Sequence, residues 1–214
     1  MKKKHLISKL LIAVILVIAS FSYAAINNTA INSARITGLE LEEVDKIIAM
    51  LKSSDPFVRA NAAQELGELA HPDATVPLIS ALTDDNIYVR AYAAEALGKI
   101  KHSQAIDPLV AALNDEDEFV QTHIVQALGE IRDPKAVTPL IDLLNSDKNV
   151  VKTRAAWALG EIRDPKAVDA LITALNDKVC CDYAAEALKK ITEQDFGVDY
   201  EEWNNWWLST NQTL

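Results

Sequence analysis

Apolar residues recur along this chain at a fixed interval of 31 positions. Three independent sets share the interval: a series of Leu-Gly pairs, a series of valines and a series of leucines. Their members are Leu66-Gly67, Leu97-Gly98, Leu128-Gly129 and Leu159-Gly160; Val58, Val89, Val120 and Val151; and Leu51, Leu82, Leu113, Leu144 and Leu175. A self-similar period of this size is typical of a solenoid or another repeat array.

The first half of each unit is predicted to be a helix. In the unit that begins near Asn86, apolar residues follow at helical spacing at Val89, Ala93, Leu97 and Ile100. Alanine and leucine dominate this segment, and both residues favour helices. Asn86 stands ahead of the segment, where its side chain can accept hydrogen bonds from the free N–H groups of the first turn.

The second half of each unit is predicted to be a second helix. Its start is marked by an acid and a proline, as in Asp133-Pro134, because an acid caps a helix and proline suits the first helical position. Leu140 and Leu144 then continue on one face. A turn of two or three residues joins the halves, so the two helices are antiparallel neighbours. Neither helix buries its apolar face alone, which predicts an all-α array of stacked pairs.

Two further rows share the period. Glycines lie near the end of the first helices, where we expect either a close approach of the partner helix or an irregular helix end. Basic or amide side chains lie just inside the first helices, near acids at the junctions between units, and predict ion pairs that set the register of the repeats. The rows are Gly67, Gly98, Gly129 and Gly160, and Arg59, Arg90, Gln121 and Lys152.

Residues 1–24 differ from the repeats. Four lysines precede an uncharged apolar run, residues 10–19. Ser22-Tyr23-Ala24 follows the run, with a small residue on each side of the tyrosine. This order is typical of a secretory signal peptide, and the apolar run is short for a membrane span. We expect cleavage after Ala24 and a periplasmic or secreted protein. The alternative is an uncleaved anchor in the inner membrane.

Charge narrows the choice of partners. The formal net charge of the chain is −10, and loss of the four lysines of residues 1–24, which contain no acid, moves it to −14. An acidic protein binds nucleic acid and anionic membranes poorly. We therefore expect no nucleic acid and no membrane contact apart from the signal peptide.

The remaining chain divides into three parts. Residues 25–38 are polar and without a clear period, and we interpret them as a linker. The solenoid is predicted over residues 39–191. The helix that forms the first half of its last unit begins two residues earlier than the period of 31 requires. Residues 192–214 leave the repeat and carry an aromatic cluster, which we expect to cover the last apolar face of the array; a binding patch is the alternative. The cluster consists of Phe196, Tyr200, Trp203, Trp206 and Trp207.

The repeat units resemble a known family. The segments VRAYAAEALGKI and AAWALGEIRDPKAVDALITAL are similar to the short HEAT-like repeats of the phycobilisome-lyase type, and the resemblance covers residues 39–191. It implies a right-handed α–α superhelix, a HEAT-like solenoid that holds other proteins. Some members attach or detach bilins, and the related deoxyhypusine hydroxylases bind iron through His-Glu pairs. An export signal argues against bilin chemistry and the sequence has no His-Glu pair, so no cofactor is expected.

Histidines and cysteines are the candidates for other chemistry. His71 and His102 lie one period apart and Asp133 and Asp164 continue their row, which is consistent either with capping of turns or with a metal site. We favour capping and expect no metal. His123 lies on the first helix of its unit and has no obvious carboxylate partner in the sequence.

Cys180 and Cys181 are adjacent in the sequence. In an oxidising compartment they either form a strained disulfide that acts as a redox switch or remain two free thiols, and we favour free thiols.

The sequence contains no nucleophile elbow, glycine-rich phosphate loop or metalloprotease motif. We expect a non-enzymatic scaffold or adaptor that binds a protein partner on a concave face lined by the second helices. A lyase- or hydroxylase-like enzyme and a redox-responsive scaffold are the alternatives. The partner-binding residues are predicted where the second helices differ between repeats: Asp73, Thr75, Gln104, Asp107, Lys135, Thr138, Lys166 and Asp169.

Overall fold

The computed structural model describes residues 41–211 of the chain. The predicted signal peptide and linker, residues 1–24 and 25–38, lie outside the described residues. The chain divides into two compact units between Lys46 and Ile47. Residues 41–50 are helical and contain this division, and the second unit, Ile47–Leu214, contains the repeats. The described residues contain helices and turns and no strand, which confirms the all-α prediction.

The first half of each repeat is a long helix. Asp55, Asn86 and Asp117 cap α2, α4 and α6 by accepting hydrogen bonds from the first-turn N–H groups. Each of the long helices ends at a residue in the left-handed conformation, whose N–H closes the last turn. The helices are α2 (Pro56–Leu69), α4 (Ile87–Ile100), α6 (Glu118–Ile131), α8 (Asn149–Ile162) and α10 (Cys181–Thr192).

The second half of each repeat has two parts. A turn of 3-10 helix comes first, and a short α-helix of two turns follows. Asp133 and Pro134 begin such a turn, with the Asp133 carboxylate accepting a hydrogen bond from the Lys135 N–H at 2.9 Å. The predicted caps are therefore confirmed, although they start a 3-10 turn and not the α-helix itself. The pairs are η1 (Pro72–Ala74) with α3 (Thr75–Ala81), η2 (Ser103–Ala105) with α5 (Ile106–Ala112), η3 (Pro134–Ala136) with α7 (Val137–Leu143), and η4 (Pro165–Ala167) with α9 (Val168–Ala174).

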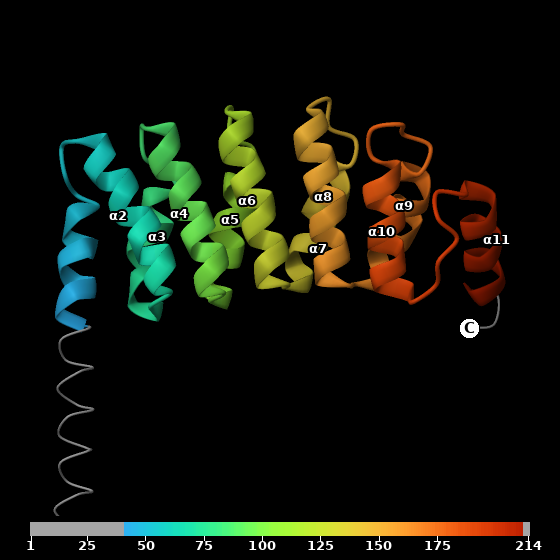
Figure 1. Ribbon diagram of the computed structural model, residues 1–214, viewed down its shortest axis with the longest axis horizontal. Helices are drawn as coiled ribbons and strands as arrows, with labels where there is room; N and C mark the ends of the chain where they lie inside the picture. The colour runs from blue at the N-terminus through green and yellow to red at the C-terminus, as the bar shows by residue number, and fades with distance from the viewer. Residues whose placement is uncertain (1–40, 212–214) are drawn as a thin grey trace, which may run out of the picture. The chain divides into compact units, whose positions relative to one another are not determined.

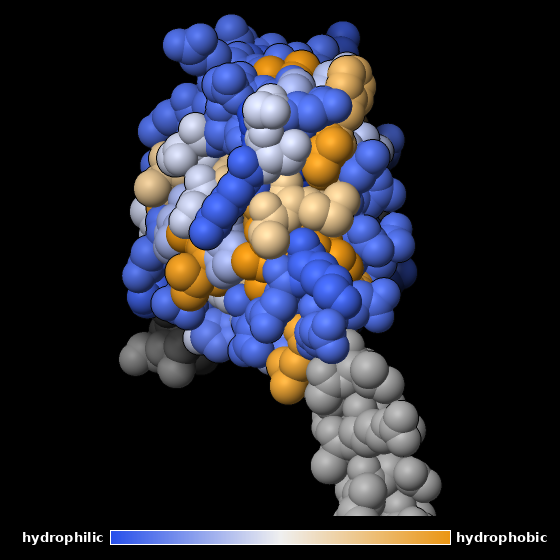
Figure 2. Space-filling view, turned by 90° about the vertical axis from the view of Figure 1, so that its left-hand side faces the viewer, coloured by the Kyte–Doolittle hydropathy of each residue, from blue (hydrophilic) through white to orange (hydrophobic). Residues whose placement is uncertain are grey.

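The long helices form one row and the short helices lie behind them (Figure 1). Each long helix packs on the next long helix, and each short helix packs on the long helix of the following repeat, as α3 does on α4. The leucines of the Leu-Gly pairs are fully buried between these layers, and each stabilises the fold by about 1.5–3 kcal/mol. The core is therefore one continuous apolar seam through the array. The face drawn in Figure 2 is mostly hydrophilic, with hydrophobic residues exposed among the polar ones.

The glycines mark a contact that differs from the predicted one. A methyl group on Gly98 would lie 2.8 Å from Cα of Ala127, which is backbone of α6 in the next repeat. Gly67 meets Ala96 in the same way. The close approach therefore joins successive long helices, whereas we predicted the antiparallel partner of the same pair. The predicted close approach is confirmed and only the helix was wrong, because spacing shows that a helix must come close but not which helix does.

The last helices depart from the repeat. Two residues are missing ahead of α10, and the Asp177 carboxylate accepts a hydrogen bond from the Val179 N–H at 2.8 Å in the shortened turn. α11 (Tyr200–Asn211) follows α10 and contacts α9, the last short helix. The C-terminal aromatic cluster of the prediction therefore lies at the end of the array.

Candidate functional site

Shallow grooves lie between successive short helices. One of about 440 Å³ separates α3 from α5, and Ile79, Pro108 and Ala111 line it. Another of about 330 Å³ lies between the end of the first described helix and α3, with Ile48 and Pro77 in the corresponding positions. Small residues and prolines leave these gaps because their side chains do not reach across to the neighbouring helix. The same groove therefore recurs along one face of the array.

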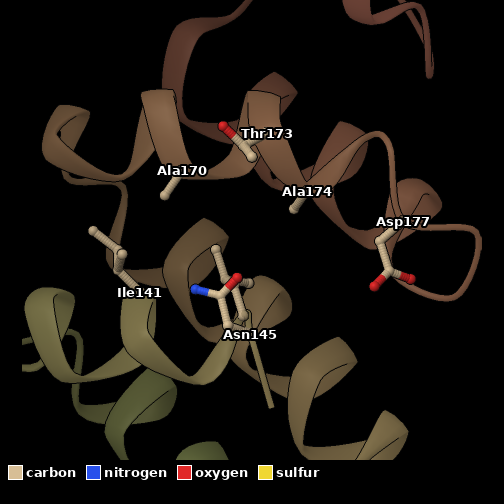
Figure 3. Close-up of a pocket in the computed structure, with 7 residues that line it drawn as sticks. Ile141, Asn145, Ala170, Thr173, Ala174 and Asp177 are labelled. Atoms are coloured by element: carbon tan, nitrogen blue, oxygen red, sulfur yellow. The ribbon is translucent and has the colours of Figure 1, made fainter. Parts of the chain in front are cut away.

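The groove between α7 and α9 has a volume of about 310 Å³ (Figure 3). Ile141, Ala170 and Ala174 give it an apolar floor, and the side chains of Asn145 and Thr173 stand at its rim. Asn145 and Thr173 are exposed. The groove therefore offers an apolar surface with an amide and a hydroxyl beside it.

At one end of each of these three grooves, an aspartate forms an ion pair with an arginine or a lysine. The Asp115 carboxylate accepts hydrogen bonds from Nε and Nη2 of Arg90 at 2.7 and 3.0 Å. Arg90 also donates from Nη1 to the Asp84 carbonyl at 2.8 Å, so it joins two consecutive loops. Burial raises the pKa of Asp115, but the hydrogen bonds from Arg90 and from the Asp117 N–H outweigh it and leave this pKa below its ordinary value. The predicted ion pairs are therefore confirmed. The equivalent pairs are Arg59 with Asp84 and Lys152 with Asp177.

The repeat in the middle of the array joins its consecutive loops without an aspartate. Gln121 replaces the arginine and donates from Nε2 to the Leu113 carbonyl at 2.8 Å. Ser146 stands where the other repeats have aspartate, and Lys148 donates from Nζ to Oε1 of Gln121 at 2.8 Å. Because Gln121 and Ser146 replace the arginine and the aspartate together, neither member of the ion pair remains alone as an unpaired charge.

The eight predicted partner-binding residues differ in their surroundings. Asp107 and Lys135 pair with each other at 3.1 Å between consecutive repeats, and both side chains are mostly exposed. The Asp169 carboxylate accepts a hydrogen bond from Nε1 of Trp207 at 2.6 Å, so the aromatic cluster engages it. The remaining exposed residues of the set lie along the start of the second half-repeats. They are Asp73, Gln104, Thr138 and Lys166.

Thr75 contradicts its prediction. Its side chain is buried, and its hydroxyl oxygen has no hydrogen-bond partner. One period on, the same position holds Ile106, then Val137 and Val168, all of them buried. Thr75 therefore belongs to the core and cannot contact a partner. The prediction was wrong because it selected positions that differ between repeats and overlooked that the equivalent residues of the other repeats are apolar.

The two histidines of the turns act as caps. Nδ1 of His71 accepts a hydrogen bond from the Asp73 N–H at 3.3 Å, and Nδ1 of His102 accepts one from the Gln104 N–H at 3.2 Å. Asp133 and Asp164 do the same at their turns. The capping interpretation is therefore confirmed. Among the described residues there is no group of three or more His, Cys, Asp or Glu side chains placed to hold a metal.

His123 has the carboxylate neighbour that the sequence did not reveal. Its Nε2 lies 4.0 Å from Oε2 of Glu95, on the preceding long helix, and its Nδ1 lies 2.8 Å from the Phe119 carbonyl oxygen. Glu95 is 28 positions earlier in the chain, so only the stacking of the repeats brings the two together.

Cys180 and Cys181 are free thiols in the structure. Cys180 is buried, and burial together with the nearby Asp177 charge raises the pKa of its thiol to about 11. A thiol with so high a pKa is a poor nucleophile at neutral pH. The low reactivity of the Cys180 thiol therefore does not support a redox switch formed by Cys180 and Cys181.

The aromatic cluster has an interior and a rim. Trp203 is fully buried and donates from Nε1 to the Gly197 carbonyl at 2.8 Å. Phe196 and Trp206 pack around it, with ring centroids 4.9 and 5.8 Å from that of Trp203. Tyr200 and Trp207 are half-buried. A buried tryptophan and the hydrogen bond from Trp207 to α9 fit a structural cover for the last repeat.

Sequence reasoning missed the groove residues themselves. Ile141, Asn145, Ala170 and Thr173 were not among the predicted contacts, because the prediction concentrated on positions that vary at the start of the second helices. A signal was present: Ile48, Ile79 and Ile141 share the period, as do Pro77 and Pro108. The period alone does not show that small residues opposite them leave a gap.

Stacked pairs of antiparallel helices, joined by one apolar seam and grooved along the short helices, define an α-solenoid. The profile of HEAT repeats matches this sequence over residues 44–127, 75–154 and 112–189. The chain therefore belongs to the family of HEAT-repeat proteins. No protein with a curated functional description matches the sequence.

Several solved structures share the fold. The complex of CpcE and CpcF of phycocyanin lyase from Nostoc sp. PCC7120 is 28% identical with a TM-score of 0.62; the match covers 71% of this chain and 65% of that one. A designed armadillo repeat protein in complex with the peptide (KR)4 is 20% identical with a TM-score of 0.56, covering 72% and 84%. Human deoxyhypusine hydroxylase is 18% identical with a TM-score of 0.50, covering 72% and 75%.

This chain thus spans 65% of the length of the lyase component that it matches. No helix among the described residues is both long and apolar enough to cross a membrane.

Proposed function

We propose that this chain is an exported, non-enzymatic scaffold that holds a protein partner along the face of its short helices. The observation that carries the proposal is the groove that recurs between successive short helices. A row of similar grooves on a repeat array suits an extended polypeptide, because each repeat can take one segment of it. Export rests on the features of residues 1–24, which resemble a signal peptide.

The chemistry of the grooves indicates what the partner presents. Ile141, Ala170 and Ala174 favour apolar side chains, and Asn145 and Thr173 can bond to the partner's main chain. The aspartates at the groove ends are held by Arg or Lys, so they add little net attraction for a cation. The designed armadillo repeat protein, which carries a bound peptide, supports the idea that a solenoid of this kind holds an extended chain.

Filling the grooves tests the proposal. Affinity-tagged chain is incubated with an extract of the cell envelope, and the proteins that it retains are identified. Ala111→Trp and Ala170→Trp place a large side chain in two grooves, whereas Gln64→Trp adds the same bulk at an exposed position of α2. We expect the parent and Gln64→Trp to retain one partner that both groove variants lose. Retention by all four proteins, or by none, contradicts the proposal.

Export has its own test. The mass and N-terminal sequence of the protein in the periplasmic fraction are measured, and we expect a chain that begins at Ala25. Full-length chain in the cytosolic fraction would contradict export but leave the groove proposal open.

An enzymatic function is the second candidate, and the likeness to the phycocyanin lyase complex is the observation that favours it. Elemental analysis of the purified protein and turnover of a small molecule would test it. Stoichiometric iron or zinc, or turnover without a partner protein, would favour the enzyme over the scaffold. The redox-responsive scaffold is tested by counting thiols on the exported protein, where two free thiols exclude it.

A further inference from the structure

A row of exposed apolar side chains runs along the starts of the long helices, away from the grooves. Phe57, Tyr88, Phe119 and Val150 are the second residues of α2, α4, α6 and α8, and Val179 has the corresponding place before α10. They are 75%, 48%, 41%, 50% and 42% exposed. The residue that follows is buried in the last four of these repeats, at Val89, Val120, Val151 and Cys180, whereas Val58 is half-buried. We call these five residues the outer row.

The fold gives no reason for the outer row to be apolar. Single exposed hydrophobic residues are common on protein surfaces, but here they stand in register on consecutive helices, and clustered exposed apolar residues mark interaction sites. Three of the five residues are aromatic: Phe57, Tyr88 and Phe119. They occupy three consecutive repeats at the N-terminal end of the array.

Between α2 and α4 the outer row opens into a groove of about 330 Å³. Phe57 and Pro56 line it from α2, Tyr88 and Tyr92 line it from α4, and Ala60 is its buried floor. Aromatic side chains around a small floor residue form a slot that fits a ring or a short aliphatic group.

The aromatic surface continues past this groove onto α6. The rings of Tyr88 and Phe119 meet edge to face with centroids 5.9 Å apart, and Phe119 and His123 have centroids 4.3 Å apart. Contact between Nδ1 of His123 and the Phe119 carbonyl oxygen, at 2.8 Å, fixes the histidine ring against its own helix. A ligand that lies along the row therefore meets aromatic rings on three helices in turn.

Charge around this part of the row is negative. Asp55 and Asp117 cap α2 and α6 two residues before Phe57 and Phe119, and Glu116 and Glu118 are exposed next to Asp117. In the first two turns of α2, α4 and α6 the arginines are Arg59 and Arg90, which form ion pairs with Asp84 and Asp115. Lys148 donates to the Glu116 carbonyl and to Gln121, so it too is held by neighbouring acceptors. The surface thus favours a cationic ligand, whose charges can also lie over the aromatic rings.

We propose that the outer row binds an extended proline-rich segment that carries lysine or arginine. Proline-rich chains adopt the polyproline II helix, which rises about 9.3 Å in each turn of three residues. Neighbouring packed helices lie about 8–10 Å apart, so successive turns of the ligand can meet successive long helices. Aromatic-lined grooves select such chains because the ligand is already ordered before it binds. The inference uses a different face from the short-helix grooves and does not depend on the proposed function.

Three synthetic peptides test the proposal with the purified full-length chain. A repeating Lys-Pro-Pro peptide has the proposed chemistry, a Glu-Pro-Pro peptide keeps the conformation with the opposite charge, and a Lys-Gly-Gly peptide keeps the charge without the conformation. Calorimetric titration should show binding of the first peptide alone, weakened by salt. No binding of Lys-Pro-Pro, or equal binding of Lys-Gly-Gly or Glu-Pro-Pro, overturns the proposal.

Variants place the binding on the outer row. Phe57→Ala and Tyr88→Ala remove exposed aromatic side chains, and each should weaken Lys-Pro-Pro binding about tenfold. Leu69→Ala, at an exposed position at the opposite end of α2 from Phe57, is the matched control and should bind like the parent. Equal affinity of all variants contradicts the assignment. A dimer that Phe57→Ala converts to a monomer would show instead that the row is an interface between copies, and would also overturn the proposal.

Discussion

At the scale of single residues, Thr75 is the clearest departure from the repeat. Its hydroxyl is buried without a partner at a position where the other repeats hold isoleucine or valine. A buried polar group without a hydrogen bond costs about 1–3 kcal/mol, and valine has nearly the same shape as threonine. The position is therefore a local loss of stability that one substitution should remove.

We expect Thr75→Val to raise the free energy of unfolding by about 1 kcal/mol. Chemical denaturation measured by circular dichroism provides the value. Thr138→Val is the control, because Thr138 is exposed on α7 and its change should have little effect. A loss of stability in Thr75→Val would show that the hydroxyl has a partner after all.

Residues also show where prediction from the sequence ends. The caps Asn86, Asp117 and Asp133 could be read directly, since a capping side chain acts on N–H groups two or three positions away. The neighbours of Gly98 and His123 could not, because both lie on adjacent long helices far along the chain. Local chemistry was visible in the sequence, and contacts across the stack required the structure.

At the scale of elements, the ladder of ion pairs ties consecutive loops together. Arg90 joins the Asp115 carboxylate to the Asp84 carbonyl, and the middle repeat replaces this arrangement by Gln121 and Ser146. The natural replacement changes both partners at once. That pattern suggests that each charge is tolerated in its half-buried place only because of the other.

A double-mutant cycle tests this coupling. Arg90→Gln and Asp115→Ser should each lower the free energy of unfolding by about 1–3 kcal/mol, because each leaves a charged group without its main partner. The double variant should lose less than the sum of the two, by about 0.5–3 kcal/mol. Denaturant unfolding of the four proteins gives these values, and strict additivity would rule out the coupling.

The ladder also predicts how acid acts on the fold. The pKa of Asp115 in the folded protein lies below its ordinary value of 3.8, despite the opposing effect of burial. Its stabilising contribution is therefore complete above that value and is lost as the pH falls through the folded pKa. We expect Tm to change little between about pH 7 and 5 and to fall below about pH 4. The Arg90→Gln, Asp115→Ser double variant should lose less Tm over the acid range; an equal loss would contradict a role for this pair.

At the scale of the whole molecule, the period of 31 residues predicted the fold and left the contact surface open. Repeated Leu-Gly pairs and capped turns are enough for an α-solenoid, because stacking is the one way to bury both helices of every pair. The binding surface depends instead on what is missing between helices. Small residues such as Ala111 and Ala170 create the grooves, and the aromatic side chains of Phe57 and Tyr88 stay exposed while the buried core of the repeats is aliphatic.

The most direct test of the scaffold is photo-crosslinking from the groove face. A photoreactive phenylalanine analogue is placed at Thr173 or Asn145, both exposed at the rim of the groove between α7 and α9, and at Gln64 on α2 as the control. After irradiation in the cell-envelope extract, the two groove positions should trap the same protein, and Gln64 should not. Crosslinks of equal yield and identity from all three positions, or none from the groove, would contradict the account.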